Sequence, residues 1–255
     1  MVVRGLEKHI TVGVMSRIGR RGRNEDSVGC DRVGNRAIWA LADGAGGHEE
    51  GDRASRMAVE AAVGVLSAAA PSDGLRSIAE RGMQAAQAAV LGERDSRPGL
   101  EIASTLTLLV SDGRAVAWGH AGDSRLYLRR RGRVRRLTQD HGLPIRPAMG
   151  SASPVQLVSA LGVRDAALDS GKAFRLAGGD VFLICSDGVW TTLPHAAIWR
   201  ACDAAPDLGA WLNAIKAMIE ASADPDQDNY SAVALCVGAW GRAARPSWLA
   251  RLWEG

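Results

Sequence analysis

Short apolar runs divided by tight turns dominate the chain and predict β-strands. Asp112-Gly113, Gly122-Asp123 and Arg131-Gly132 separate four of these runs and predict an antiparallel meander across residues 103–137. Ala177-Gly178-Gly179 predicts a further hairpin. The predicted strands cover residues 10–15, 36–42, 103–110, 115–121, 125–130, 134–137, 172–176, 180–185 and 230–237.

Other segments repeat apolar residues at helical spacing and predict helices at 51–69, 75–91 and 208–222. The first two are rich in alanine, which allows close packing on a sheet. Strands, a helix pair, many strands, a helix and a last strand follow one another. This order favours a layered α+β fold with antiparallel sheets over alternating βαβ units. The charged stretch 16–27 is too polar for a core, and the prolines and glycines of 141–154 predict an irregular loop.

Composition adds bounds on the class of protein. The 255 residues suffice for one large domain, which we place at 1–240, followed by a tail at 241–255 that docks on this protein or on a partner. A formal charge of +3 is too small to indicate a nucleic-acid partner. Four scattered cysteines indicate reduced thiols, and no run is apolar enough for a membrane helix. We therefore expect a soluble, cytoplasmic, monomeric protein without membrane contact.

Candidate chemistry begins at Asp43, which lies between an apolar strand and a glycine-rich turn. Such a turn lets backbone groups approach an ion or a phosphate closely, and the adjacent carboxylate indicates a cation. Gly44-x-Gly46 is also compatible with a dinucleotide loop. However, Glu49 takes the third glycine position and a second predicted helix follows, so a nucleotide cofactor is disfavoured.

Three more aspartates share the position of Asp43 at the end or start of a predicted strand: Asp123, Asp187 and Asp228. Any one of them is more often a turn residue than a metal ligand. In antiparallel sheets, however, the exit of one strand lies beside the entry of the next, so the four predict a carboxylate cluster. Clustered carboxylates need compensating positive charge, and oxygen ligands select Mg²⁺ or Mn²⁺ over zinc.

These motifs together resemble the metal-dependent protein serine/threonine phosphatases of type 2C, in particular their single-domain bacterial members. The matching pieces run in the family's order over nearly the whole chain. They are Arg21-Gly-Arg-Asn24-Glu25-Asp26-Ser27, Ala42-Asp43-Gly44-Ala-Gly46-Gly47-His48, Ser104-Thr105-Leu106, Gly122-Asp123-Ser124-Arg125, Leu137-Thr138-Gln-Asp140-His141, Ala160-Leu161-Gly162, Ser186-Asp187-Gly188 and Asp228-Asn229. The resemblance implies a β-sandwich of two antiparallel sheets flanked by pairs of helices.

It also implies a metal centre and a reaction. Asp43 would bridge two Mn²⁺ or Mg²⁺ ions, Gly44 would offer its carbonyl, and a hydroxide activated between the ions would attack the phosphorus. The remaining ligands implied are Asp187 and Asp228, with Glu25 and Asp26 acting through water, and Asp123 with Asp187 for a third, weaker ion. Arg21 matches the arginine that takes the substrate phosphate.

Two features of the reaction stay open. His48 is the candidate acid for the leaving alkoxide, and its alternative is a loop histidine that caps or packs. For His141, ordering a turn by hydrogen bonds is favoured over catalysis. Residues 140–162 are shorter than the corresponding segment of the family, which implies a reduced flap. Because the family's flap contributes to the third-metal site, this reduction affects the expectation of a third ion at Asp123.

The function implied is hydrolysis of phosphoserine and phosphothreonine on proteins, opposing a bacterial serine/threonine kinase. One alternative is a phosphatase devoted to a single regulator, such as an anti-sigma-factor antagonist. The other is a pseudophosphatase that binds a phosphoprotein without turnover, which the intact Asp43, Asp187 and Asp228 disfavour.

Overall fold

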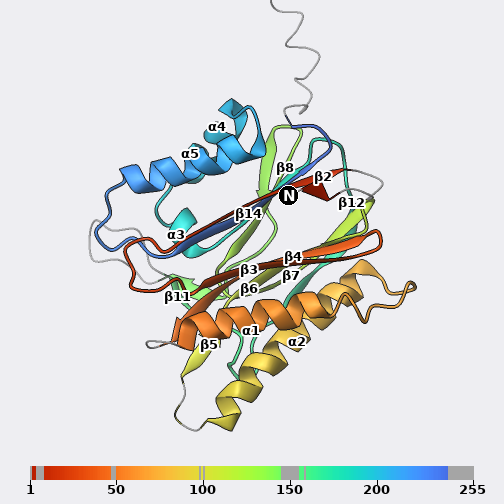
Figure 1. Ribbon diagram of the computed structural model, residues 1–255, viewed down its shortest axis with the longest axis vertical. Helices are drawn as coiled ribbons and strands as arrows, with labels where there is room; N and C mark the ends of the chain where they lie inside the picture. Colours follow the sequence, from red (N-terminus) through yellow and green to blue (C-terminus); the bar gives the residue numbers. More distant parts are fainter. Residues whose placement is uncertain are drawn as a thin grey trace, which may run out of the picture.

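Two six-stranded antiparallel sheets lie face to face, with helices on both outer sides (Figure 1). The computed structural model describes residues 2–3, 9–46, 50–97, 99, 101–144, 155–157 and 159–240. Helices α1 (Glu50–Gly64) and α2 (Leu75–Ser96) cover one sheet. Helices α3 (Asp187–Trp190), α4 (His195–Ala204) and α5 (Leu208–Ala221) cover the other. The predicted α+β sandwich is therefore confirmed.

The first sheet has the order β1-β2-β14-β13-β8-β9 and the second the order β12-β7-β6-β4-β3, with β5 paired to β4. A separate pair is formed by β10 and β11. The strands are β1 (Val2–Val3), β2 (Ile10–Arg17), β3 (Asp26–Val33), β4 (Arg36–Gly46), β5 (Ile102–Ser104), β6 (Leu106–Ser111), β7 (Ala115–Ala121), β8 (Arg125–Arg130), β9 (Arg133–Arg136), β10 (Gly142–Pro144), β11 (Val155–Leu157), β12 (Asp169–Arg175), β13 (Val181–Cys185) and β14 (Tyr230–Val237).

Alternating side chains of the central strands enter different apolar cores. In β4, Ile38 and Ala40 pack toward α1 and α2, whereas Trp39 and Leu41 pack between the two sheets. This is the two-residue period of a strand that is buried on both faces. Because both faces must be filled, the site's strands have little freedom to slip in register.

Two predicted connections are wrong. The meander is divided, because β7 belongs to the second sheet and β8 to the first. Gly122 adopts φ +99° at this crossover, a conformation that suits glycine. Likewise β12 and β13 form no hairpin, because β12 pairs with β7 while β13 pairs with β8 and β14. Turn residues mark where the chain reverses, but packing decides which sheet the next strand joins.

Further elements were absent from the sequence prediction. Strand β3 begins inside the stretch assigned to a polar loop, and its first residue, Asp26, is buried. Part of the predicted irregular loop forms β10, while residues 145–154 and the tail 241–255 lie outside the described residues. Helices α3 and α4 were not predicted either. In the described ranges, no helix has the length and apolar character needed to cross a membrane.

Candidate active site

The register of β3 and β4 places Asp26 directly opposite Asp43. Asp26 is 7% exposed, and its Oδ2 accepts a hydrogen bond from Ser186 Oγ at 2.8 Å. Its other oxygen, Oδ1, is buried and has no hydrogen-bond partner. Burial is the main cause that raises the pKa of Asp26 to about 7. A buried carboxylate oxygen without a partner is uncommon, and a bound ion or water is one way to satisfy it.

Asp187 brings a second unpartnered oxygen to the same place from the other sheet. It opens α3 directly after β13, and its carboxyl group interacts with that of Asp43 by a hydrogen bond. The Oδ1 atom of Asp187 is also buried without a partner. Burial, followed by the negative charge of Asp228, raises the pKa of Asp187. The two sheets thus close around Asp43 with oxygen atoms that lack a positive partner.

Hydrogen bonds from Ser104, the last residue of β5, and from Thr105, between β5 and β6, fix the backbone of Asp43. The Asp43 N–H donates to Thr105 Oγ1 at 2.9 Å, and the Thr105 N–H donates back to the Asp43 carbonyl at 2.8 Å. Ser104 Oγ donates to the same carbonyl at 3.1 Å. Thr105 Oγ1 also lies 2.9 Å from Ser124 Oγ, next to Asp123. Asp43 therefore has a fixed main chain, and its side chain lies near the carboxylates of Asp187 and Asp26.

Asp123 lies in the crossover between β7 and β8 and is 8% exposed. Trp190 Nε1 donates to its carbonyl at 3.1 Å, which ties the crossover to α3. Burial and then the charge of Asp187 raise the pKa of Asp123 to about 7. The structure thereby places Asp123 close enough to Asp187 for the two charges to interact.

The segment 138–141 clamps this crossover. Thr138 Oγ1 accepts the Leu126 N–H at 3.1 Å, and Asp140 binds Arg125 through Nη2 at 2.7 Å and Nε at 3.1 Å. The Arg125 guanidinium also stacks on Trp190, 3.4 Å from the ring centroid. These contacts fix the chain on the C-terminal side of Asp123.

His141 completes the clamp and orders the turn, as the favoured interpretation predicted. The backbone N–H of His141 donates to the Gly122 carbonyl at 2.7 Å, and the ring Nδ1 of His141 accepts the Gly122 backbone N–H at 3.3 Å. Since Nδ1 accepts, the ring proton lies on Nε2, which is 3.0 Å from Asp169 Oδ2. Both ring nitrogens are thus engaged with protein groups.

Arg21 and Asp228 form an ion pair at the outer edge of the cluster, with Nη2 2.9 Å from Oδ2. The Arg21 side chain is 57% exposed and can be reached from solvent. Asn229 holds the loop that carries Arg21, because its Nδ2 donates to the carbonyls of Ile18 and Arg23, both at 2.7 Å. This loop is therefore fixed to the entry of β14.

Glu25 links that loop to the glycine turn after Asp43. The Glu25 N–H donates to Asn229 Oδ1 at 2.7 Å, and the Glu25 carbonyl accepts the Gly44 N–H at 3.1 Å. Burial and then the charge of Asp228 raise the pKa of Glu25. A Cβ at Gly44 would lie 1.9 Å from the Gly51 carbonyl oxygen, so this close approach requires glycine. His48 lies outside the described residues, between Gly44 and Gly51.

The net pKa shifts of Glu25, Asp26, Asp43, Asp123 and Asp187 are all upward. Desolvation, and then the charges of Asp187 and Asp26, raise the pKa of Asp43 well above its ordinary value. Among the described residues, no three acidic, histidine or cysteine side chains converge tightly enough to form a finished ion-binding shell. Mutual repulsion opposes such convergence until positive charge is supplied. The donor set, all oxygen and with two orphaned atoms, fits a hard divalent cation such as Mg²⁺ or Mn²⁺.

Several residues that build the site received no role in the sequence analysis. Trp190 had no identifiable signal, because its contact joins segments far apart in the chain. Thr105, Ser186 and Asn229 lay inside recognised motifs, and the signal for them was that position alone. Thr105, Trp190 and Asn229 bind backbone groups of neighbouring segments. Ser186 instead donates directly to the Asp26 carboxylate.

The family model for protein phosphatase 2C matches residues 15–229, a span that includes every described acidic residue of this cluster. The chain belongs to the protein phosphatase 2C family. Among curated proteins it is similar to the serine/threonine protein phosphatase PstP of Mycobacterium tuberculosis, with 31% identity over 191 residues and 71% of this chain covered. The chain spans only 36% of the length of that relative.

Two further comparisons agree with membership of the 2C family. The serine/threonine phosphatase stp of Listeria welshimeri is 29% identical over 190 residues, which cover 69% of this chain and 75% of the relative. A crystal structure of the catalytic domain of PstP in complex with two manganese ions superposes with a TM-score of 0.74 at 26% identity. That match covers 90% of this chain and 99% of the PstP domain.

Proposed function

We propose that this protein removes phosphate from phosphoserine and phosphothreonine residues of proteins with the help of two divalent cations, Mn²⁺ or Mg²⁺. The observation that carries the proposal is the pair of buried, unpartnered oxygens of Asp26 and Asp187 on either side of Asp43. Such atoms are costly in a folded protein unless a ligand satisfies them. Family membership and the manganese-bound PstP structure support the same conclusion.

In this proposal each acidic residue has a role at the metal centre. Asp43 would contact both ions, Gly44 would contribute its carbonyl, and Asp187 and Asp228 would hold one ion. Glu25 and Asp26 would complete the shell through water, and Asp123 with Asp187 would form a weaker third site. When bound, such cations lower the pKa of water toward neutrality and neutralise phosphate charge.

The chain's own residues would bind and orient the substrate. Arg21 is the proposed phosphate ligand because its guanidinium is exposed, lies beside Asp228 and offers parallel N–H donors. The hydrogen bonds of Asn229 keep the Arg21 loop in place before substrate arrives. His48 is the proposed donor of the proton that the leaving alkoxide requires.

A direct assay would measure phosphate release from a phosphothreonine peptide and from an aryl phosphate with millimolar Mn²⁺. We expect activity that a chelator abolishes and that Asp187→Asn and Asp43→Asn reduce by about a hundredfold or more, since each removes a charged oxygen ligand. Asp226→Asn, at an exposed position outside the cluster, serves as the matched control. Full activity of Asp187→Asn would refute the assignment.

The role of His48 has its own test. An aryl phosphate releases a weakly basic phenolate that needs no proton, whereas an alkoxide does need one. His48→Gln should therefore slow peptide hydrolysis by roughly tenfold to a hundredfold more than aryl phosphate hydrolysis. Equal losses on both substrates would contradict a role as proton donor.

The proposal extends to the setting of the reaction. A protein kinase acting on the same serine or threonine residues would supply the substrate, and we propose that both work in the cytoplasm with this chain as a monomer. Light scattering of the purified chain tests the monomer. Manganese binding without turnover on any substrate would favour a pseudophosphatase, and turnover of a single phosphoprotein would favour a dedicated regulator phosphatase.

A further inference from the structure

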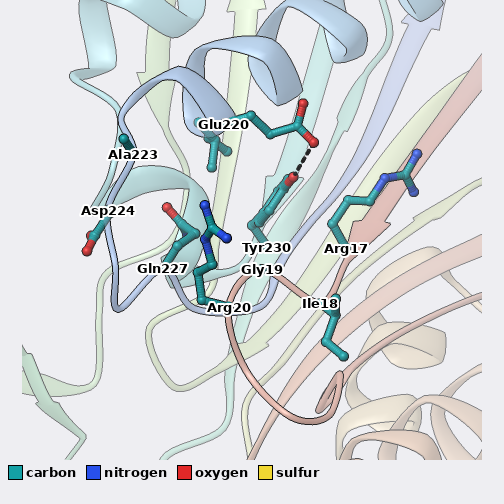
Figure 2. A pocket seen from close by; sticks show the side chains of 10 residues that line it. Arg17, Ile18, Gly19, Arg20, Glu220, Ala223, Asp224, Gln227 and Tyr230 are labelled. Atoms are coloured by element: carbon teal, nitrogen blue, oxygen red, sulfur yellow. Dashed lines mark hydrogen bonds between the residues drawn. The ribbon is translucent and has the colours of Figure 1, made fainter.

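A cavity of about 320 Å³ lies between the loop that follows β2 and the C-terminal end of α5 (Figure 2). Arg17, Ile18 and Arg20 line it from the end of β2 and the following loop, and Glu220 and Asp224 from the end of α5 and the residues after it. No residue of the proposed metal centre lines it. The cavity is therefore separate from the acidic cluster and requires an explanation of its own.

The cavity directly adjoins the proposed phosphate-binding pair. The Arg20 N–H donates to the Gln227 carbonyl at 2.8 Å, and the next residue on each segment belongs to the Arg21–Asp228 ion pair. A Cβ at Gly19 would lie 2.2 Å from the Asp228 carbonyl oxygen, and Gly19 adopts φ +62°. The two segments are thus in tight backbone contact, and the cavity adjoins the place where Arg21 would receive a phosphate.

The floor of the cavity is rigid and its rim is open. Gln227 and Tyr230 are buried at the floor. Thr192 Oγ1 donates to Gln227 Oε1 at 2.9 Å, and Gln227 Nε2 donates to the Gly188 carbonyl at 3.1 Å. A preformed hollow of this kind can receive a side chain without reorganising the fold.

The charges around the cavity are unequally satisfied. Glu220 already contacts Lys216 Nζ at 3.2 Å and accepts the Tyr230 hydroxyl at 3.5 Å. Asp224 Oδ1 accepts the Asp226 N–H at 2.9 Å. In contrast, the guanidinium of Arg20 has no hydrogen bond or ion pair with any described residue, and it points into the space beside Gln227 in Figure 2. Arg20 is thus the lining residue whose charged group has no partner among the described residues.

We propose that this cavity binds an acidic side chain located within a few residues of the phosphorylated residue in the substrate polypeptide. Arg20 is the specificity-determining contact, and Arg17 adds positive charge at the rim. This inference rests on the proposed phosphatase function and specifies its substrate class. Arg20 directly precedes Arg21, the proposed phosphate ligand. Adjacent residues of an extended substrate chain are separated by about 3.3–3.6 Å, so the acidic residue is expected within a few positions of the phosphorylated one.

The test uses three sets of phosphothreonine peptides that carry Glu, Gln or Lys at each position within three residues of the phosphothreonine. We expect kcat/KM for the best Glu peptide to exceed that of its Gln counterpart about fivefold, as for an ion pair near the surface. Arg20→Gln should abolish this preference, and Arg20→Glu should shift it toward the Lys peptide. Arg135→Gln removes a positive charge from an exposed position on β9, an edge strand of the sheet that also contains β2. This variant should keep the preference for the Glu peptide.

The results of these assays distinguish a failure of the cavity proposal from a failure of the proposed phosphatase function. Equal kcat/KM for Glu and Gln peptides at every position, or a preference unchanged in Arg20→Gln, would overturn the cavity proposal while leaving phosphatase activity intact. If neither an aryl phosphate nor any peptide were hydrolysed with Mn²⁺, the proposed function would fail. Fluorescence anisotropy with the same peptides would then still decide whether Arg20 selects an acidic neighbour.

Discussion

Replacing Asp26 by asparagine should make the metal-free protein more stable at pH 8, although it damages the proposed metal centre. Asp26 is buried, its Oδ1 has no partner and its pKa is about 7 instead of 3.8. The folded state therefore binds more protons than the unfolded state between about pH 4 and 7, and stability falls as the pH rises through that window. Asparagine has nearly the same shape and carries no charge.

The magnitude follows from the size of the shift. About three pKa units at 1.36 kcal/mol each give an upper limit of about 4 kcal/mol for the cost of ionising Asp26 in the folded protein. Neighbouring Asp187 and Asp228 share part of that cost. We therefore expect Asp26→Asn to raise the free energy of unfolding at pH 8 by about 1–3 kcal/mol, and to have little effect at pH 4.

Urea unfolding in the presence of a chelator at pH 4, 6 and 8 measures this difference. Asp226→Asn, at an exposed position, is the control and should change stability little at any of these pH values. Saturating Mn²⁺ should reverse the order, because a ligand stabilises the protein that binds it more tightly. A metal-free variant that is less stable than wild type at pH 8, or a difference that is the same at pH 4 and 8, would refute the reasoning.

Three further predictions concern the groups around the cluster. Asn229→Ala removes three hydrogen bonds from the Arg21 loop and should lower the free energy of unfolding, measured in urea, by about 2–4 kcal/mol. Asn213→Ala, on the exposed side of α5, is the control and should lower the same free energy by under about 1 kcal/mol. Gly44→Ala forces Cβ against the Gly51 carbonyl and should lower the melting temperature. Gly92→Ala in α2, where Cβ meets open space, should raise it. Equal shifts of the melting temperature would contradict the close approach of Gly44 to Gly51. The buried ring of His120 has a pKa of about 4, chiefly through desolvation. The stability that the neutral ring contributes should therefore be lost as the pH falls from about 6.5 toward 4. An NMR titration midpoint of the His120 ring near 6.5 would show that the ring is not buried as described.

Much of the candidate site could be predicted because its acidic residues are local features of the sequence. Asp43, Asp187 and Asp228 each adjoin a strong apolar strand, and strand ends in a sandwich meet at common edges. The strand at residues 230–237 was predicted with the bounds that the structure gives to β14. Periodicity and turn residues act over a few positions, so the sequence reveals them directly.

The elements that were missed depend on distant partners. Strand β3 reads as polar, and it forms because β4 pairs with it along eight residues and because α1 covers it. The crossovers after β7 and β12 look like hairpin turns, and only the competition between two sheets for the following strand separates them from true hairpins. Long-range pairing overrides weak local preference in both cases.

The sequence by itself determined which groups the candidate site contains: carboxylates at strand ends, a glycine turn beside Asp43 and an arginine loop before β3. The tertiary structure alone decided which oxygens of Asp26 and Asp187 remain without partners, and that Arg20 faces a cavity beside Arg21. Residue type fixes what a group can bind. Whether the group is left free to bind depends on burial and on hydrogen bonds from segments more than a hundred residues away, such as the one between Ser186 and Asp26.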